Sequence, residues 1–376
     1  MTELEYQVNP DIEEQLIRNP YNCIRDYAES RLIKVGRKLY SYLALQPISL
    51  FAPDIPNKDG FSKPNLNFLL LGPASSGKTT TLLLMRDICY NPYLFQDVTG
   101  AKIVQDLLGK DKTSLLCTDV DTIFRDPELI KILEGVVGEE SMINRLNMRS
   151  SASFTTNAVF LGCGLFESLR ENIRYGFLQR MIPLVIYHTK EEKVLIVQAI
   201  KDGMFTNSQK MSFMDIKWYY KKIAEIQKNH NDKFPRIEGY LVDEKVKNEL
   251  FRAWLEIMEK NQYPEDQYLT REFYSIMKYM CNSAILNMFN REVSKQNGQR
   301  VIVPNRQDIE LAKSLFNNEM EAKYNILTLS MMASNIRREN AIKFYDYVRN
   351  NDAISHEYKQ IGKIFAEQKI EKKIKE

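Results

Sequence analysis

The first half of the chain alternates between short apolar runs and segments in which apolar residues recur with helical spacing. Four runs predict buried strands, at residues 67–71, 114–119, 158–163 and 181–187. Unbroken apolar runs of this length are typical of strands covered on both faces. Because helical segments separate the strands, the pattern predicts an α/β layer with a parallel sheet.

The pattern changes after about residue 190, where strand-like runs nearly vanish. Helical spacing dominates from there, at residues 243–260, 270–290, 306–317 and 340–349. Residues 11–50 also have helical spacing. We therefore expect four segments in order: an N-terminal helical segment (1–60), an α/β domain (61–190), an all-helical domain (191–330) and a C-terminal helical extension (331–376).

The residues between the first strand and the next helix match the phosphate-loop pattern G-x-x-x-x-G-K-[ST] without substitution. They are Gly72, Pro73, Ala74, Ser75, Ser76, Gly77, Lys78 and Thr79, with Thr80 continuing into the helix. A strand, such a loop and a helix bind nucleotide phosphates, because backbone N–H groups and the positive helix end face the anion. We expect Lys78 to reach the β- and γ-phosphates and the Thr79 hydroxyl to hold Mg²⁺. ATP and Mg²⁺ are the expected cofactors, although no motif distinguishes ATP from GTP.

A second acidic position follows the strand at residues 114–119. A phosphate-loop NTPase needs a carboxylate at the end of a neighbouring strand to hold the Mg²⁺ shell. Asp119 stands at that place, and Asp121 is two residues further on. Many strands end in Asp, so the position downstream of the phosphate loop is what favours a metal-holding role for Asp119.

Composition and charge exclude several classes of protein. The 376 residues are 44% apolar and 27% charged, and the net charge of +3 is too small to indicate nucleic-acid binding by itself. The five cysteines form no C-x-x-C pair, which argues against a zinc site or a disulfide framework. The N-terminus lacks the pattern of a signal peptide, and no apolar run is long enough for a membrane span. We expect a cytoplasmic protein with no membrane partner.

An α/β nucleotide domain followed by a helical domain resembles the AAA+ ATPases. Within that group, the order of several short runs is similar to the ATPase core of the minichromosome maintenance (MCM) helicases. These runs are residues 97–101, 127–134, 172–173, 177–180 and 269–273. The similarity covers roughly residues 25–320 with large gaps, and only the phosphate loop is specific. It implies a three-layer AAA+ domain with a helical lid, and a homo-oligomeric ring (for example a hexamer) or open arc that acts on nucleic acid, most readily DNA.

The resemblance also implies roles for four arginines. Arg180 matches the arginine finger that reaches the nucleotide of a neighbouring subunit, although an Arg at a helix end can also be a simple C-terminal cap. Arg271 matches a sensor arginine at the start of a lid helix, with a solvated Arg as the alternative. Arg145 and Arg149 fall where MCM proteins carry a hairpin that grips DNA, but a short helix or an ordinary surface loop fits this segment as well.

Three departures from the family pattern limit the comparison. Val120 stands where the family has a glutamate that polarises the attacking water, so either Asp121 takes over that task or hydrolysis is slow. Cys163 and Gly164 stand where a polar sensor residue is expected. The separate N-terminal DNA-binding ring of MCM proteins has no expected counterpart, and its loading function is not carried over.

Two function classes remain open from the sequence. The first is an ATP-driven nucleic-acid motor in replication or related DNA processing. The second is a nucleotide-gated switch or loader that binds ATP and a protein partner with little hydrolysis. A phosphate-loop kinase fits less well, because no acceptor site is visible between residues 190 and 235. The C-terminal segment predicts either a plain helical extension or a partial winged helix, the latter being a DNA-binding module.

Overall fold

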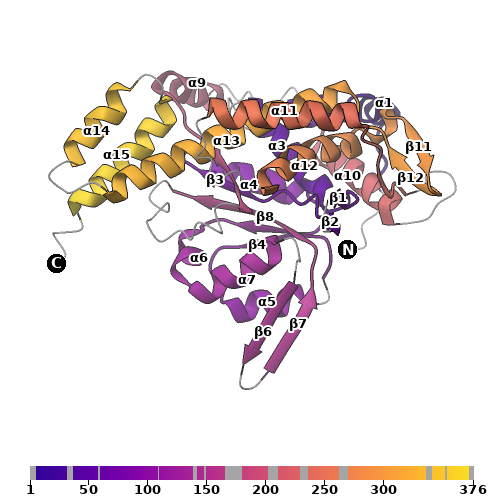
Figure 1. Cartoon of the computed structure of the whole chain (residues 1–376), viewed down its shortest axis with the longest axis horizontal. Coiled ribbons are helices and arrows are strands. Elements are labelled where there is room, and N and C mark those ends of the chain that lie inside the picture. The colour runs from indigo at the N-terminus through magenta and orange to yellow at the C-terminus, as the bar shows by residue number, and fades with distance from the viewer. Residues whose placement is uncertain are drawn as a thin grey trace.

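The computed structural model describes most of the chain. The described ranges are residues 6–31, 37–57, 60–108, 110–138, 142–147, 150–165, 180–201, 211–228, 236–261, 270–335, 341–351 and 354–371. Helices line both sides of a central sheet, and a two-stranded hairpin projects away from it (Figure 1). No helix in these ranges combines the length and the apolar character needed to cross a lipid bilayer.

The central sheet has five strands, all parallel to their neighbours. They are β3 (Phe68–Leu71), β4 (Pro92–Phe95), β5 (Thr113–Cys117), β8 (Ala158–Gly164) and β9 (Ile182–Val185). Their spatial order is β4-β5-β8-β3-β9. The strand that leads into the phosphate loop, β3, therefore lies between β8 and β9, and β8 separates it from β5.

Alternating side chains of β3 show how the sheet is covered on both faces. Phe68 and Leu70 belong to one large apolar core, whereas Leu69 and Leu71 belong to a second core on the opposite face. All four side chains are fully buried. A strand with both faces covered has no polar face, which explains the unbroken apolar runs in the sequence.

Helices before the sheet, and those between its strands, complete the two outer layers. They are α1 (Pro10–Arg18), α2 (Pro20–Arg31), α3 (Arg37–Ser49), α4 (Lys78–Ile88), α5 (Gly100–Leu107), α6 (Asp121–Arg125) and α7 (Pro127–Val137). A short hairpin, β1 (Ile55–Asn57) with β2 (Gly60–Ser62), joins α3 to the sheet. Asp126 begins α7 as expected of an N-cap, because its carboxylate accepts hydrogen bonds from the N–H groups of Glu128 and Leu129.

The projecting hairpin precedes β8 directly. It consists of β6 (Met142–Asn147) and β7 (Ser150–Thr155), paired antiparallel from Met142–Thr155 to Asn147–Ser150. Of the conformations that the sequence left open for this segment (a hairpin, a short helix or a surface loop), the structure has the hairpin. In Figure 1 it extends away from the sheet on the side opposite α11 and α13.

Helices dominate the remainder of the chain. They are α9 (Lys190–Lys201), α10 (Phe213–Lys228), α11 (Glu244–Lys260), α12 (Thr270–Leu286), the 3-10 turn η3 (Met288–Asn290), α13 (Arg306–Asn335), α14 (Ala341–Asn350) and α15 (His356–Glu371). Residues of α10, α12 and the first half of α13 share the large core with β3 and α3, so these helices are continuous with the sheet domain. The end of α13, α14 and α15 pack into the second core.

The prediction that residues 191–330 are all-helical is wrong at one place. A small sheet of β10 (Gly239–Tyr240), β12 (Gln299–Ile302) and β11 (Val293–Gln296) lies within this segment. Asn297 and Gly298 form the turn between β11 and β12, with φ of 51° and 83°. An Asn-Gly pair adopts positive φ at low cost and so favours a two-residue hairpin. The Asn-Gly pair therefore favours the hairpin even though the flanking residues alternate only weakly between apolar and polar.

Candidate nucleotide-binding site

The phosphate loop connects the buried end of β3 to the first turn of α4. Gly77 immediately precedes the helix with a left-handed backbone, at φ 87°, which a side chain would strain. Gly72 is required for a different reason: a Cβ there would lie 2.3 Å from the carbonyl oxygen of Ile186, the residue directly after β9. The loop therefore passes so close to the neighbouring strand that only glycine fits at its first position.

The Lys78 ammonium lies across this loop. It donates hydrogen bonds to the carbonyl oxygens of Gly72 and Pro73, both at 2.7 Å, and to Ser76 Oγ at 3.4 Å. The ammonium is thus fixed at the N-terminal end of α4, where the helix dipole and free N–H groups are positive. An ammonium group and a helix N-terminus are the two groups that favour binding of a phosphate anion.

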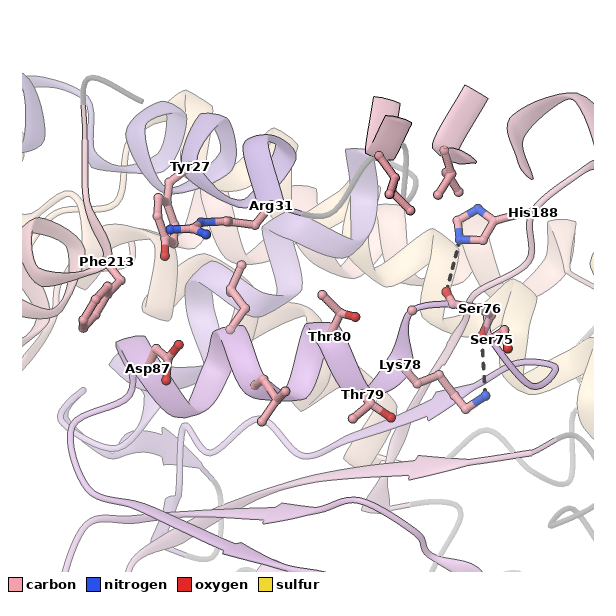
Figure 2. Close-up of a pocket in the computed structure, with 15 residues that line it drawn as sticks. Tyr27, Arg31, Ser75, Ser76, Lys78, Thr79, Thr80, Asp87, His188 and Phe213 are labelled. Atoms are coloured by element: carbon pink, nitrogen blue, oxygen red, sulfur yellow. Dashed lines mark hydrogen bonds between the residues drawn. The ribbon is translucent and has the colours of Figure 1, made fainter. Parts of the chain in front are cut away.

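A cavity of about 740 Å³ opens beside the loop and runs along α4. Its volume lies within the range of small-molecule sites. Ser75 to Thr80 form one end, and Tyr27 and Arg31 of α2 form the other, with Asp87 below them (Figure 2). Apolar side chains of Leu83, Leu84, Ile196, Ile200 and Phe213 complete the wall. The loop end suits phosphates and the mixed apolar and aromatic end suits a nucleobase.

His188 is a lining residue that the sequence analysis did not identify. It lies three residues after the end of β9, is 4% exposed, and its Nε2 lies 3.1 Å from the carbonyl oxygen of Ser76. Nδ1 is buried and, within the described part of the chain, makes no hydrogen bond. A lone histidine after an apolar strand carries no functional pattern in sequence, so only the fold brings it to the phosphate loop.

The two candidate carboxylates lie beyond β8 from the loop. Asp119 follows β5, and its carboxylate accepts a hydrogen bond of 2.9 Å from the N–H of Asp121. Cys163 on β8 lies between this group and the loop, since its thiol contacts the Lys78 carbonyl at 3.6 Å. Burial raises the pKa of the Cys163 thiol to about 12; the Lys78 ammonium opposes this shift and the Asp119 carboxylate adds to it. The thiol is therefore protonated at neutral pH, and both charges act on its pKa.

Val120 is excluded from the site by its burial. Its side chain is 1% exposed and packs so closely on β8 that a Cβ on Gly162 would lie 2.4 Å from Val120 Cγ1. Asp121 begins α6, and its carboxylate faces Arg125 at 3.9 Å. Among the described residues, neither Asp119 nor Asp121 lines the cavity. Asp121 therefore lies on the β5 side of the loop, outside the cavity.

Mg²⁺ would find oxygen ligands of the kind it prefers at this edge. The Thr79 hydroxyl is in the first turn of α4 and exposed, and the Asp119 carboxylate is half-buried at the end of β5. A hydroxyl and one carboxylate are the protein ligands that Mg²⁺ commonly takes together with phosphate oxygens and water. The donor set thus fits the metal expected from the sequence.

The remaining predicted residues lie elsewhere. Arg180 is half-buried and precedes β9 at the amino end of the sheet, whereas the loop is at the carboxyl end. Arg271 is in the first turn of α12 and Arg145 in β6, opposite Ala152; their side chains, and the whole of Arg149, fall outside the description of the structure. The structure thus brings together the loop residues and places Arg180 at the opposite end of the sheet from them.

No protein-family model and no curated protein sequence matches this chain. The functional assignment therefore rests on the residues of the site and their arrangement.

Proposed function

We propose that this protein is an ATP-binding AAA+ ATPase that works as an oligomeric motor on nucleic acid, similar to an MCM-type DNA helicase or translocase. The observation that carries the proposal is the geometry of the loop from Gly72 to Thr79. Gly72 packs against the chain that leaves β9, and the carbonyl oxygens of Gly72 and Pro73 accept hydrogen bonds from the Lys78 ammonium at the start of α4. The cavity beside it gives room for the rest of a nucleotide.

The order of the strands is compatible with a phosphate-loop NTPase. The loop after β3 and Asp119 after β5 both follow the carboxyl ends of parallel strands, and β8 lies between these two strands. The hairpin that precedes β8 also agrees with the MCM resemblance, because it projects from the body of the domain, where a nucleic-acid strand could contact it (Figure 1).

The chemistry proposed is transfer of the γ-phosphoryl group of ATP to water. Lys78 would neutralise charge on the β- and γ-phosphate oxygens, and the free N–H groups at the start of α4 would bind others. Mg²⁺ held by Thr79 and Asp119 would supply further charge neutralisation. Asp121 is the carboxylate that remains to orient the attacking water, because the Val120 side chain is buried in the core.

ATP hydrolysis with and without single-stranded DNA tests this proposal. A motor should hydrolyse ATP faster when DNA is present, and the stimulation should fall as the salt concentration rises, because phosphate contacts release counterions. Equal rates with and without DNA at low salt would contradict the motor function while leaving nucleotide binding in place.

A nucleotide-gated switch is the second candidate, and the burial of Val120 favours it. If hydrolysis depends on Asp121, the Asp121→Asn variant should lose about 100-fold in kcat, since general-base contributions are of that size. Its affinity for MgATP should stay near that of the wild type. Asp346→Asn, on the exposed surface of α14, is a matched control.

Steady-state rates and binding isotherms of the two variants decide between the candidates. A slow wild-type rate that Asp121→Asn does not change would mean that this carboxylate has no part in hydrolysis, and the switch would be the better description.

A further inference from the structure

A cluster of cations lies at the amino end of the sheet, opposite the phosphate loop. Lys112 immediately precedes β5, Lys228 ends α10, and Arg236 begins the segment that leads to β10. Lys228 and Arg236 are exposed and Lys112 is half-buried. No described ion pair neutralises any of the three.

Hydrogen bonds hold these three segments together. The buried Gln227 amide donates to the carbonyl oxygens of Phe51 (3.1 Å) and Ile237 (3.3 Å) and accepts from the N–H of Ile237 (2.9 Å). Lys228 directly follows Gln227, and Arg236 directly precedes Ile237, so these bonds bring the two cations close together. The Lys112 ammonium donates to the carbonyl oxygen of Leu50 at 3.0 Å, next to Phe51. These hydrogen bonds therefore fix the positions of the three cation-bearing segments relative to one another.

Aromatic rings orient the lysine side chains. The Lys112 and Lys228 ammonium groups lie 4.9 and 5.9 Å from the centre of the Phe51 ring, and Lys228 is 4.3 Å from that of Tyr90. Lys228 also contacts the Tyr90 hydroxyl at 2.7 Å. Two ammonium groups on one ring are within about 11 Å of each other. That separation suits contacts to nearby phosphates of one strand.

The local charge is positive although two acids are near. Asp54 and Asp111 are exposed, and both carboxylates act on the Lys112 ammonium. Burial lowers the pKa of Lys112; Asp111 and Asp54 oppose this shift, and Arg236 and Lys228 add to it. Counting Lys112 itself, three cations stand against two carboxylates in this group, which leaves one positive charge that an external anion can neutralise.

The base of the projecting hairpin adjoins this cluster. Thr156, which follows β7, donates its hydroxyl to the Lys110 carbonyl at 3.4 Å, and Asn157 Nδ2 donates to the Leu50 carbonyl at 3.3 Å. The Lys112 ammonium donates to the same Leu50 carbonyl, so a strand that runs along the hairpin towards the sheet would reach the cation cluster. A repeating series of phosphates fits several neighbouring cations better than an isolated anion does.

We propose that Lys112, Lys228 and Arg236 form a second site, which binds the phosphate backbone of a single-stranded nucleic acid where it passes the base of the β6–β7 hairpin. The inference rests on the nucleic-acid part of the proposed function, but not on ATP hydrolysis. It assigns backbone contacts only, so binding should be independent of base sequence.

The test uses the full-length protein and a fluorescently labelled oligo(dT) strand, titrated at several salt concentrations without nucleotide. Lys228→Gln/Arg236→Gln removes two exposed cations. Its Kd should be about tenfold weaker, and the slope of log K against log salt should be shallower by about 1.4, because each lost phosphate contact removes about 0.7. Lys112→Gln, which keeps a donor for the Leu50 carbonyl, should reduce the slope by about 0.7.

The matched control, Lys245→Gln/Lys343→Gln, removes the same charge from exposed positions of α11 and α14 and should bind like the wild type. Equal affinity and slope for the two double variants would overturn the inference alone. Competition by polyglutamate as strong as that by oligo(dT) at equal charge would overturn the assignment to nucleic acid. A wild type that binds no oligo(dT) at low salt would contradict both the inference and the motor function. ATP hydrolysis that DNA does not stimulate would contradict the motor function alone, and it is measured in a separate experiment.

Discussion

Replacing Lys78 by alanine is expected to weaken MgATP binding about 100-fold, which corresponds to about 2.7 kcal/mol. The ammonium is already held inside the loop by the carbonyl oxygens of Gly72 and Pro73, at the place where the phosphates would lie. Removing it takes away a charge-assisted contact that no other described side chain of the loop supplies. The helix end and the loop N–H groups remain, so weak binding should persist.

Thermal unfolding with and without nucleotide measures this effect. A ligand at 100 times its Kd stabilises the folded state by about 2.7 kcal/mol, so MgATP should raise the Tm of the wild type clearly. The Lys78→Ala variant should unfold near the wild-type Tm without nucleotide and show little shift at the same MgATP concentration. Lys131→Ala, which removes an exposed lysine from α7, should respond to MgATP like the wild type.

Replacing Arg180 by alanine is expected to lower the rate of ATP hydrolysis about 1,000-fold while leaving the affinity for MgATP nearly unchanged. Arg180 lies six residues before Ile186, which is level with Gly72, so about 20 Å of strand separates it from its own loop. An arginine at that distance cannot reach the nucleotide of its own subunit. In the proposed oligomer it would act on the nucleotide of a head-to-tail neighbour.

Mixing two inactive variants tests whether Arg180 acts on a neighbour. Chains with Arg180→Ala keep an intact phosphate loop, and chains with Lys78→Ala keep an intact Arg180. In an equimolar mixture with random head-to-tail assembly, about a quarter of the interfaces combine the two intact parts, so about a quarter of the wild-type rate should return. A mixture no faster than its separate components would contradict action on a neighbour, and Arg252→Ala on α11 controls for a lost surface arginine.

The sequence was most informative where one local signal determines the structure. The apolar runs located β3, β5, β8 and β9, because strands covered on both faces have no polar positions. It did not reveal β4, which begins with Pro92 and is partly exposed at the sheet edge. Proline and weak burial are the features that make an edge strand look like a loop.

Long-range packing accounts for what the sequence could not show. The break in pattern near residue 190 predicted a separate domain, but α10 and α12 bury their apolar faces against the same core as α3 and β3. Periodicity reveals that a helix has an apolar face, and it does not reveal which surface that face covers. His188 and the cations at Lys112, Lys228 and Arg236 are brought to their places by such contacts and share no spacing along the chain.

Equilibrium dialysis of radiolabelled ATP with Mg²⁺ and the full-length protein tests the central claim most directly. The account predicts saturable binding of about one nucleotide per chain, displaced by unlabelled ATP and by pyrophosphate and strongly weakened by Lys78→Ala. Binding that fails to saturate, or that Lys78→Ala leaves unchanged, would contradict the assignment of the loop from Gly72 to Thr79 as the nucleotide site.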